Sequence, residues 1–207
     1  MKPVDRVAGP AKTGGRRPRV VQSGVRGLTI IELMTVLIVL GVLVSVIVAP
    51  AISGMIARHR VQGVNAEILG DLQLARSEQA QRTGNNTSVA VSFGSNADMT
   101  CYAIHTVSGL TACDCTRSPG DACAAVPGAR EIKTLQLQRV EGVSVAASSA
   151  GGASITFVPP QGLAQPGDLV IDVQSTTRGQ LRTSVSDRGV PSVCSPDGSI
   201  PGVRTCP

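Results

Sequence analysis

The chain has 207 residues, a formal net charge of +5 at pH 7, one Tyr, two Phe and no Trp. Seven basic residues and one acidic residue precede Leu28 and give this leader a charge of +6, which leaves −1 for the rest of the chain. A nearly neutral body excludes a global positive field for nucleic acid, so any such contact would need a local patch. The scarcity of aromatic residues argues against base stacking.

The leader, residues 1–27, is followed by an apolar run, residues 28–49, in which the only interruptions are Thr29, Glu32, Thr35, Gly41 and Ser45. A helix needs about 20 mostly apolar residues to span a bilayer, so this run predicts one membrane-spanning segment. Lys and Arg remain on the cytoplasmic side of a membrane, which places the C-terminal part of the chain on the other side. The charge and hydropathy pattern therefore predicts a single-pass membrane protein.

Glu32 lies inside this run, where an ionised side chain costs about 2.5–3.5 kcal/mol at the bilayer centre, so its presence suggests a function. Two other interpretations of the N-terminal region are a plain anchor and a secretory signal, whose cleavage site is imitated by Ala49-Pro50-Ala51. The run is longer than the apolar core of an ordinary secretory signal, which has about 7–15 residues, and this argues against a secretory signal. A lone acid in an anchor would extend its carboxylate to the membrane interface.

The sequence RGLTIIELM, residues 26–34, resembles the processing site of type IV prepilins and type II secretion pseudopilins. That family has a basic leader ending in Gly, then an apolar residue, usually Phe, and a Thr-Leu-Ile-Glu-Leu-like sequence. Here Leu28 replaces Phe. The resemblance implies cleavage between Gly27 and Leu28 by prepilin peptidase and N-methylation of Leu28. Glu32, one helical turn from the new ammonium, is then expected to neutralise it in the same or a neighbouring chain during assembly.

A helical period continues after Pro50, which predicts an amphipathic continuation of the helix over residues 50–84 with a kink at Pro50. The apolar stripe consists of Ala57, Val61, Val64, Ile68, Leu72 and Ala75. Its simplest interpretation is packing against the sheet of the same domain. Gly84 followed by two asparagines is typical of a helix end.

Short segments of strand character follow, separated by turns rich in Gly, Pro, Ser and Asn. They are residues 87–93, 101–107, 131–138, 153–159, 168–174 and 180–187. One long helix followed by short strands predicts an α+β fold with an antiparallel β-sheet domain over residues 85–207, which is the arrangement of a type IV pilin.

All six cysteines lie in this β domain: Cys101, Cys113, Cys115, Cys123, Cys194 and Cys206. An even number on the non-cytoplasmic side predicts disulfides. Cys113 and Cys115 are too close in sequence to pair with each other, so each is expected to reach Cys101 or Cys123, while the last two close the tail. A zinc site is the alternative, but the spacing lacks the paired C-x-x-C arrangement. We therefore expect disulfides, no metal and no cofactor.

The two histidines are the remaining candidates for chemistry. His59 lies between two arginines on the predicted helix and is expected in solvent, and His105 lies in a predicted strand and is expected to be structural. A Cys–His nucleophile pair needs a third group to orient it, for which the sequence offers no candidate. We therefore expect no enzyme.

Three further segments narrow the resemblance to the FimT/GspH group of minor pilins and pseudopilins. They are LQLARSEQAQRTG (residues 72–84), ITFVPPQGLAQPG (155–167) and LRTSVSDRGVPSVC (181–194). The resemblance implies a structural subunit of a type II secretion pseudopilus or a type IV pilus, held in the inner membrane with its C-terminal domain in the periplasm before assembly. It implies prepilin peptidase, the inner membrane and other pilins or pseudopilins as partners, the last through the N-terminal helix.

Some FimT-type members bind DNA during natural transformation through a Gly-Arg-x-Arg stretch near the C-terminus. The matching residues here are Gly189-Val190-Pro191-Ser192, without either arginine. The last third of the chain is still locally basic through Arg178, Arg182, Arg188 and Arg204, and phosphate contacts require only basic side chains within reach. DNA binding is therefore the alternative function and not the favoured one.

Overall fold

The computed structural model describes residues 27, 29–82, 87–107, 112–159 and 162–207, without the side chains of residues 47–51. The chain divides into two compact units, Met1–Leu43 and Val44–Pro207. In the first unit the described residues form helix α1 (Ile30–Leu43), whose side chains are all exposed. Within the described part of the chain, no helix combines the length and the apolar content that crossing a membrane requires.

The second unit begins with a π-helical stretch, Val44–Val48, followed by the long helix α2 (Ala49–Gln81). Pro50 is the second residue of α2. Because proline has no N–H to donate and its ring clashes with the carbonyl four residues earlier, regular α-helical bonding is disturbed here, and the sequence predicts a kink at this point. The helix ends at Gln81, three residues before its predicted end, and residues 83–86 lie outside the described part of the chain.

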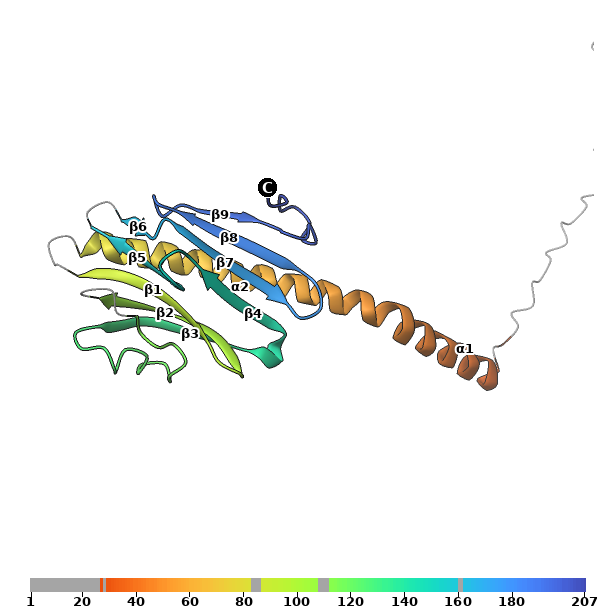
Figure 1. Cartoon of the computed structure of the whole chain (residues 1–207). Coiled ribbons are helices and arrows are strands. Elements are labelled where there is room, and N and C mark those ends of the chain that lie inside the picture. Colours follow the sequence, from red (N-terminus) through yellow and green to blue (C-terminus); the bar gives the residue numbers. More distant parts are fainter. Residues whose placement is uncertain (1–26, 28, 83–86, 108–111, 160–161) are drawn as a thin grey trace, which may run out of the picture. The chain divides into compact units, whose positions relative to one another are not determined.

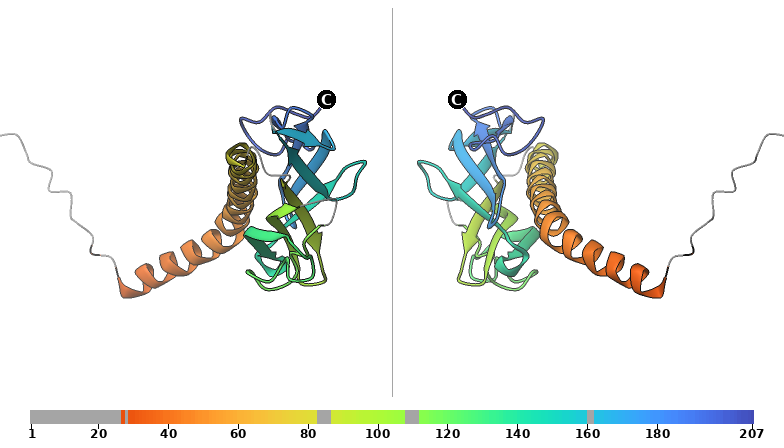
Figure 2. Two further views of the ribbon diagram at one scale, coloured as in Figure 1. Left: turned by 90° about the vertical axis from the view of Figure 1, so that its left-hand side faces the viewer. Right: turned by 90° about the vertical axis from the view of Figure 1, so that its right-hand side faces the viewer.

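Two antiparallel sheets lie on the same side of α2 (Figures 1 and 2). The first has the strand order β3-β2-β1-β5-β6, and its strands are β1 (Ser88–Ser95), β2 (Met99–Val107), β3 (Arg130–Gln138), β5 (Ser154–Val158) and β6 (Leu163–Gln165). The second has the order β4-β7-β8-β9, with β4 (Val143–Ser148), β7 (Asp168–Ser175), β8 (Gln180–Ser186) and β9 (Pro191–Cys194). A short 3-10 helix, η2 (Arg139–Glu141), connects β3 to β4. The predicted α+β, pilin-like fold is confirmed.

Each of the six predicted strands is present, with ends that differ by one or two residues, and β4, β6 and β9 are additional. The three additional strands are edge strands of the two sheets. They are short or rich in Ala and Ser, and β9 begins with Pro191, which fits an edge strand because it has no N–H for a ladder. Their strand conformation comes from pairing with a neighbour and not from a strong local pattern.

The core lies between α2 and the two sheets. The predicted stripe of α2 is confirmed, because five of its residues are buried and Val64 is partly buried against them. The stripe packs on side chains of both sheets, among them Val91, Ile104, Phe157, Leu169, Ile171 and Val173. Burying one such aliphatic or aromatic side chain contributes about 1.5–3 kcal/mol, so this single interface joins the helix and both sheets into one core.

Candidate functional site

The N-terminal region contains the residues predicted for processing and assembly. Gly27 and Thr29 are described, whereas Leu28 lies outside the described residues. The N–H of Glu32 donates to Oγ1 of Thr29 at 3.3 Å, and the N–H of Leu33 donates to the Thr29 carbonyl at 3.1 Å. Thr29 therefore caps α1, and the exposed Glu32 occupies the third helical position, as in a Thr-x-x-Glu capping box. This second role of Glu32 was not predicted above, although the Thr-x-x-Glu spacing before an apolar run indicates it.

A network of polar side chains fastens α2 to the first sheet. The buried Tyr102 of β2 donates its hydroxyl to Oδ2 of Asp71 at 2.7 Å. Lys133 of β3 places its Nζ 2.8 Å from Asp71 and 3.1 Å from Glu67. Burial raises the pKa of Tyr102 far above its usual value, and the hydrogen bond to Asp71 raises it further, so the phenol stays a neutral donor. Burial alone would lower the pKa of Lys133, but Asp71 and Glu67 outweigh it and raise that pKa.

Two further buried hydrogen bonds fix α2 along its length. Thr183 of β8 donates its hydroxyl to Oδ1 of Asn65 at 2.8 Å, which ties the helix to the second sheet. The N–H of Val89 in β1 donates to Oε1 of Gln79 at 2.7 Å, near the C-terminal end of the helix. Because a buried polar group without a partner costs about 1–3 kcal/mol, these bonds favour one axial position and rotation of α2 on the sheets.

The three segments that carry the resemblance to the FimT/GspH group meet at one place. Gly162 has a φ of +63°, and a Cβ on it would lie 3.2 Å from Cγ of Arg76 in α2. Gly189 has a φ of +68°, and a Cβ on it would lie 3.2 Å from the carbonyl oxygen of Gly162. Both positions combine a left-handed backbone with a close neighbour, which glycine alone tolerates without strain. Close packing therefore explains why glycine occupies positions 162 and 189 in two of these segments.

All six cysteines are paired, as Cys101–Cys115, Cys113–Cys123 and Cys194–Cys206. The sequence left open which of Cys113 and Cys115 reaches Cys101, and the structure assigns Cys115. The four sulfur atoms of the zinc alternative are therefore bonded in disulfides and are not thiolate ligands.

The structure also places the two histidines. His105 is fully buried, within 4.8 Å of the sulfur atoms of Cys113 and Cys123, and its Nδ1 lies 3.4 Å from the carbonyl oxygen of Ala103. Because these two sulfurs form a disulfide, the Cys–His combination has no nucleophilic thiol. His59 is exposed on α2, in the position predicted for it.

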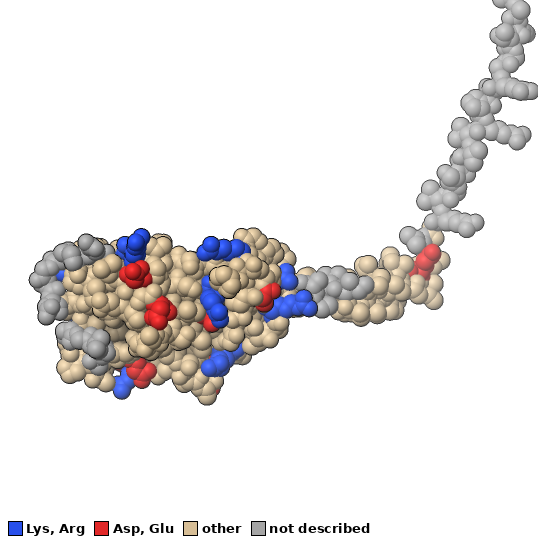
Figure 3. Space-filling model, turned by 45° about the horizontal axis from the view of Figure 1, so that its top comes forward, with Lys and Arg blue, Asp and Glu red and all other residues tan. Residues whose placement is uncertain are grey.

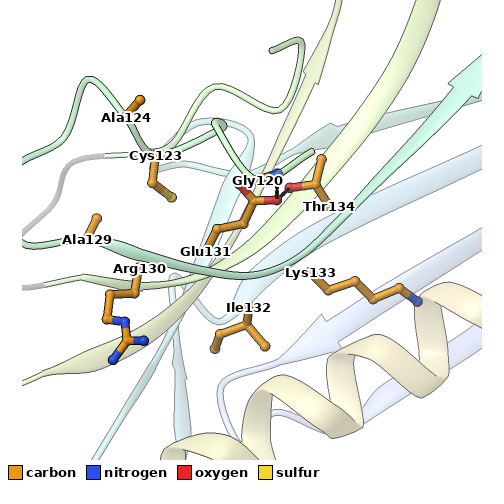
Figure 4. Close-up of a pocket in the computed structure, with 9 residues that line it drawn as sticks. All are labelled: Gly120, Cys123, Ala124, Ala129, Arg130, Glu131, Ile132, Lys133 and Thr134. Carbon is orange, nitrogen blue, oxygen red and sulfur yellow. Dashed lines mark hydrogen bonds between the residues drawn. The ribbon is translucent and has the colours of Figure 1, made fainter. Parts of the chain in front are cut away.

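The described part of the segment between β2 and β3, residues 112–129, packs on one face of the first sheet, where Cys115 and Ala122 contact Cys101 and Ala103 of β2, and it borders a pocket of about 560 Å³ (Figure 4). Glu131 accepts hydrogen bonds from the N–H groups of Gly120 and Ala122, both at 2.9 Å, and from the Thr134 hydroxyl at 2.6 Å. Gln136 donates to two further carbonyl oxygens of the segment. These bonds tie the segment to the side chains of β3.

The same hydrogen bonds make Glu131 a structural acid. Partial burial alone would raise the pKa of Glu131, but the bonds from Thr134, Gly120 and Ala122 outweigh it and hold that pKa below its usual value. A carboxylate saturated by three donors is a poor general base, and Cys123 beside it is in a disulfide. The described lining of this pocket therefore contains no activated nucleophile.

Replacing Glu131 with glutamine is expected to lower the free energy of unfolding by about 1–2 kcal/mol at neutral pH, because charge-assisted hydrogen bonds are lost. A lowered folded-state pKa means that this stabilisation is present above the unfolded pKa, about 4.5, and is lost as the pH falls through the folded pKa. Urea unfolding followed by circular dichroism at several pH values measures the difference. Replacing the exposed Glu141 with glutamine is the control. A difference for Glu131→Gln that persists at about pH 2 would contradict the assignment.

The four arginines proposed as a DNA contact are distributed over the second sheet and the tail. Arg178 is in the turn before β8 and Arg188 in the turn after it, and a strand of seven residues separates these turns by about 23 Å. Arg182 pairs with Asp172 through two bonds of 2.8 and 3.1 Å, which raise the pKa of Arg182 and occupy its guanidinium. Arg204 is in the C-terminal tail. The fold therefore separates Arg178 from Arg188, and Asp172 occupies the guanidinium of Arg182.

The chain matches the family model described as type II transport protein GspH over residues 65–189, which is more than half of its length. No curated protein and no solved structure matches it. The matched region begins in α2 and ends at Gly189, so it contains the Tyr102–Asp71–Lys133 network and the contact between Gly162 and Gly189. Its arrangement of one helix packed on two antiparallel sheets agrees with the resemblance found in the sequence. The chain therefore belongs to the GspH family of type II transport proteins.

Proposed function

We propose that this chain is a minor pseudopilin that is cleaved after Gly27 and enters a type II secretion pseudopilus through its N-terminal helix. As a member of the GspH family it is a structural pseudopilin that assembles with other pseudopilins, and it is not an enzyme. The observation that carries the finer proposal is the character of α1, which exposes apolar side chains all around its axis. Such a helix is stable only among lipids or among other apolar helices.

Before assembly, residues 28–49 would hold the chain in the inner membrane, with the basic leader in the cytoplasm and the β domain in the periplasm. The charge of the leader supports this orientation because basic residues remain on the cytoplasmic side. The three disulfides also support it, because disulfides form and persist in oxidising compartments such as the periplasm.

Prepilin peptidase would cleave between Gly27 and Leu28, and the new amino group would be methylated. Glu32 would then pair with this ammonium in its own chain or in a neighbour within the fibre. Its exposure in α1 supports such a contact, since nothing in the described structure covers it. In a water-poor environment an ion pair of this kind is strong and sensitive to geometry, so it would select the register of adjacent subunits.

Intact-mass measurement and N-terminal sequencing of the membrane-extracted protein test this proposal. The expected mature chain lacks residues 1–27 and begins with a methylated Leu28, because the peptidase releases the leader and the amine is then modified. Uncleaved protein from a host without prepilin peptidase is the control. A chain that begins after Ala49 or Ala51, or one that keeps its leader in the presence of the peptidase, would contradict the proposal.

A further inference from the structure

We infer that the β domain has its own membrane-binding surface, formed by Val140 and the arginines around it at the end of the domain where α2 begins. The inference rests on the proposed anchoring in the inner membrane and goes beyond it, because an anchored domain could equally stand clear of the lipid. The partner is an anionic bilayer surface, and the contact joins the arginines to lipid phosphates and Val140 to the interface.

Three segments far apart in the sequence meet at this end of the domain. The first part of α2, η2 and the turn between β7 and β8 line a groove of about 290 Å³. Arg60 donates from Nη1 to the carbonyl oxygen of Glu141 at 2.8 Å, and the N–H of Thr176 donates to the carbonyl oxygen of Gly142 at 3.0 Å. Both bonds hold η2 against its neighbours, so this surface is a built part of the fold.

Val140 projects from η2 and is 87% exposed, more than any other large apolar side chain in the described part of the chain. Met55 and Ile56 on the adjoining turn of α2 are also exposed, at 60% and 48%. Exposing apolar groups to water costs about 25 cal/mol for each Å². An exposed apolar tip beside basic side chains is typical of a surface that lies in the headgroup region of a membrane.

Four arginines lie in the segments that form this groove: Arg60 lines it, and Arg58, Arg139 and Arg178 are each next in sequence to a residue that lines it. Arg139 also donates from Nε to the carbonyl oxygen of Asn96 at 3.3 Å. Asp98, Glu141 and Asp197 are acidic residues near them, since the N–H of Arg139 donates to the Asp98 carbonyl oxygen at 2.8 Å and Asp197 lies 2.9 Å from the Ser195 hydroxyl that bonds to Gln180. The surface therefore has an excess of positive charge, and basic side chains gather toward this end of the domain (Figure 3). Each basic residue near an anionic bilayer strengthens binding about fivefold.

The position of this surface along the chain fits a bilayer better than it fits a distant partner. Ser53 and Ile56 lie about 6 and 10 Å along the helix axis from Ala49, where the proposed spanning segment ends. The headgroup layer is about 5–8 Å thick on each side of a bilayer. The groove lined by these two residues would therefore lie at the depth of the lipid phosphates or just outside it.

A tryptophan introduced at position 140 tests this inference, because the chain contains no other. The full chain carrying Val140→Trp is reconstituted in phosphatidylcholine vesicles with and without phosphatidylglycerol, both with brominated acyl chains that quench nearby indoles. The control is Val190→Trp, because Val190 is 53% exposed in the turn between β8 and β9 at the opposite end of the domain (Figure 1). We expect quenching and a blue-shifted emission for Val140→Trp only with phosphatidylglycerol, and neither for Val190→Trp.

Two further changes distinguish the contribution of the arginines to membrane binding from the contribution of the apolar side chain at position 140. Arg139→Gln and Arg178→Gln, added to Val140→Trp, are each expected to lower the ratio of bound to free domain about fivefold. Raising the salt concentration to about 1 M is expected to release the domain, because the Debye length falls to about 3 Å. Quenching that is equal with and without phosphatidylglycerol would overturn the role of the arginines and with it the inference.

Flotation of the vesicles distinguishes the inference from the proposed function. Protein that floats with the vesicles while Val140→Trp behaves like Val190→Trp would overturn the inference and leave the anchoring intact. Protein that does not float would overturn the anchoring, and the inference with it. Val140→Trp emission that changes only on mixing with other pseudopilins would assign this surface to a neighbouring subunit and would also overturn the inference.

Discussion

Replacing Asp71 with alanine is expected to lower the free energy of unfolding by about 3 kcal/mol, the largest effect of any single polar change in this domain. The substitution leaves the buried Tyr102 hydroxyl without its acceptor and Lys133 without its nearest carboxylate. A buried donor without a partner costs about 1–3 kcal/mol, and loss of one member of a partly buried ion pair adds to this. Urea unfolding of the full chain in detergent, followed by circular dichroism and by the fluorescence of its only tyrosine, measures the change.

Two milder substitutions in the same network are the controls. Tyr102→Phe removes one hydroxyl and leaves the Asp71–Lys133 pair, so it is expected to cost about 1 kcal/mol. Because this variant lacks the only tyrosine, its unfolding is followed by circular dichroism alone. Glu67→Ala removes a carboxylate whose side chain is 41% exposed, and such pairs contribute about 0–1 kcal/mol. If Asp71→Ala cost no more than Glu67→Ala, the network would not be what holds α2 to the first sheet.

Replacing Glu32 with glutamine is expected to abolish incorporation into the pseudopilus while cleavage after Gly27 continues. Glutamine serves at the third position of a capping box as glutamate does, so the start of α1 is preserved and only the charge is removed. Without the carboxylate, the N-terminal ammonium would enter an apolar helix bundle unpaired, which costs several kcal/mol. The fraction of protein in sheared pseudopili, compared with the fraction in membranes, measures incorporation, and intact mass measures cleavage.

Thr29→Ala is the matched change that separates capping from charge. It removes the Oγ1 that accepts the Glu32 N–H, at a cost of about 1 kcal/mol to the helix, and it keeps the carboxylate. We expect this variant to be incorporated nearly as well as the unchanged protein. Normal incorporation of Glu32→Gln, or an equal loss for both variants, would remove the argument for charge pairing.

The positions of α2 and the six stronger strands follow from the sequence because their signals are local. The stripe through Val61, Ile68 and Leu72 repeats with the helical period, and a helix with one apolar face must bury it. The missed edge strands have no such signal, since β6 has only three residues and β4 is mostly Ser and Ala. A strand of that kind forms because a neighbour supplies its hydrogen-bond partners.

Membership in the GspH family could also be predicted from the sequence, because the segments at residues 72–84 and 155–167, which lie inside the matched region, are local patterns that can be recognised before the chain is folded. Only the tertiary structure decided that Cys101 pairs with Cys115 and that Asp71 meets Tyr102. These relations join residues 14 and 31 positions apart. Chain reversals set such distances, and a one-dimensional pattern of polarity carries no information about where the chain returns.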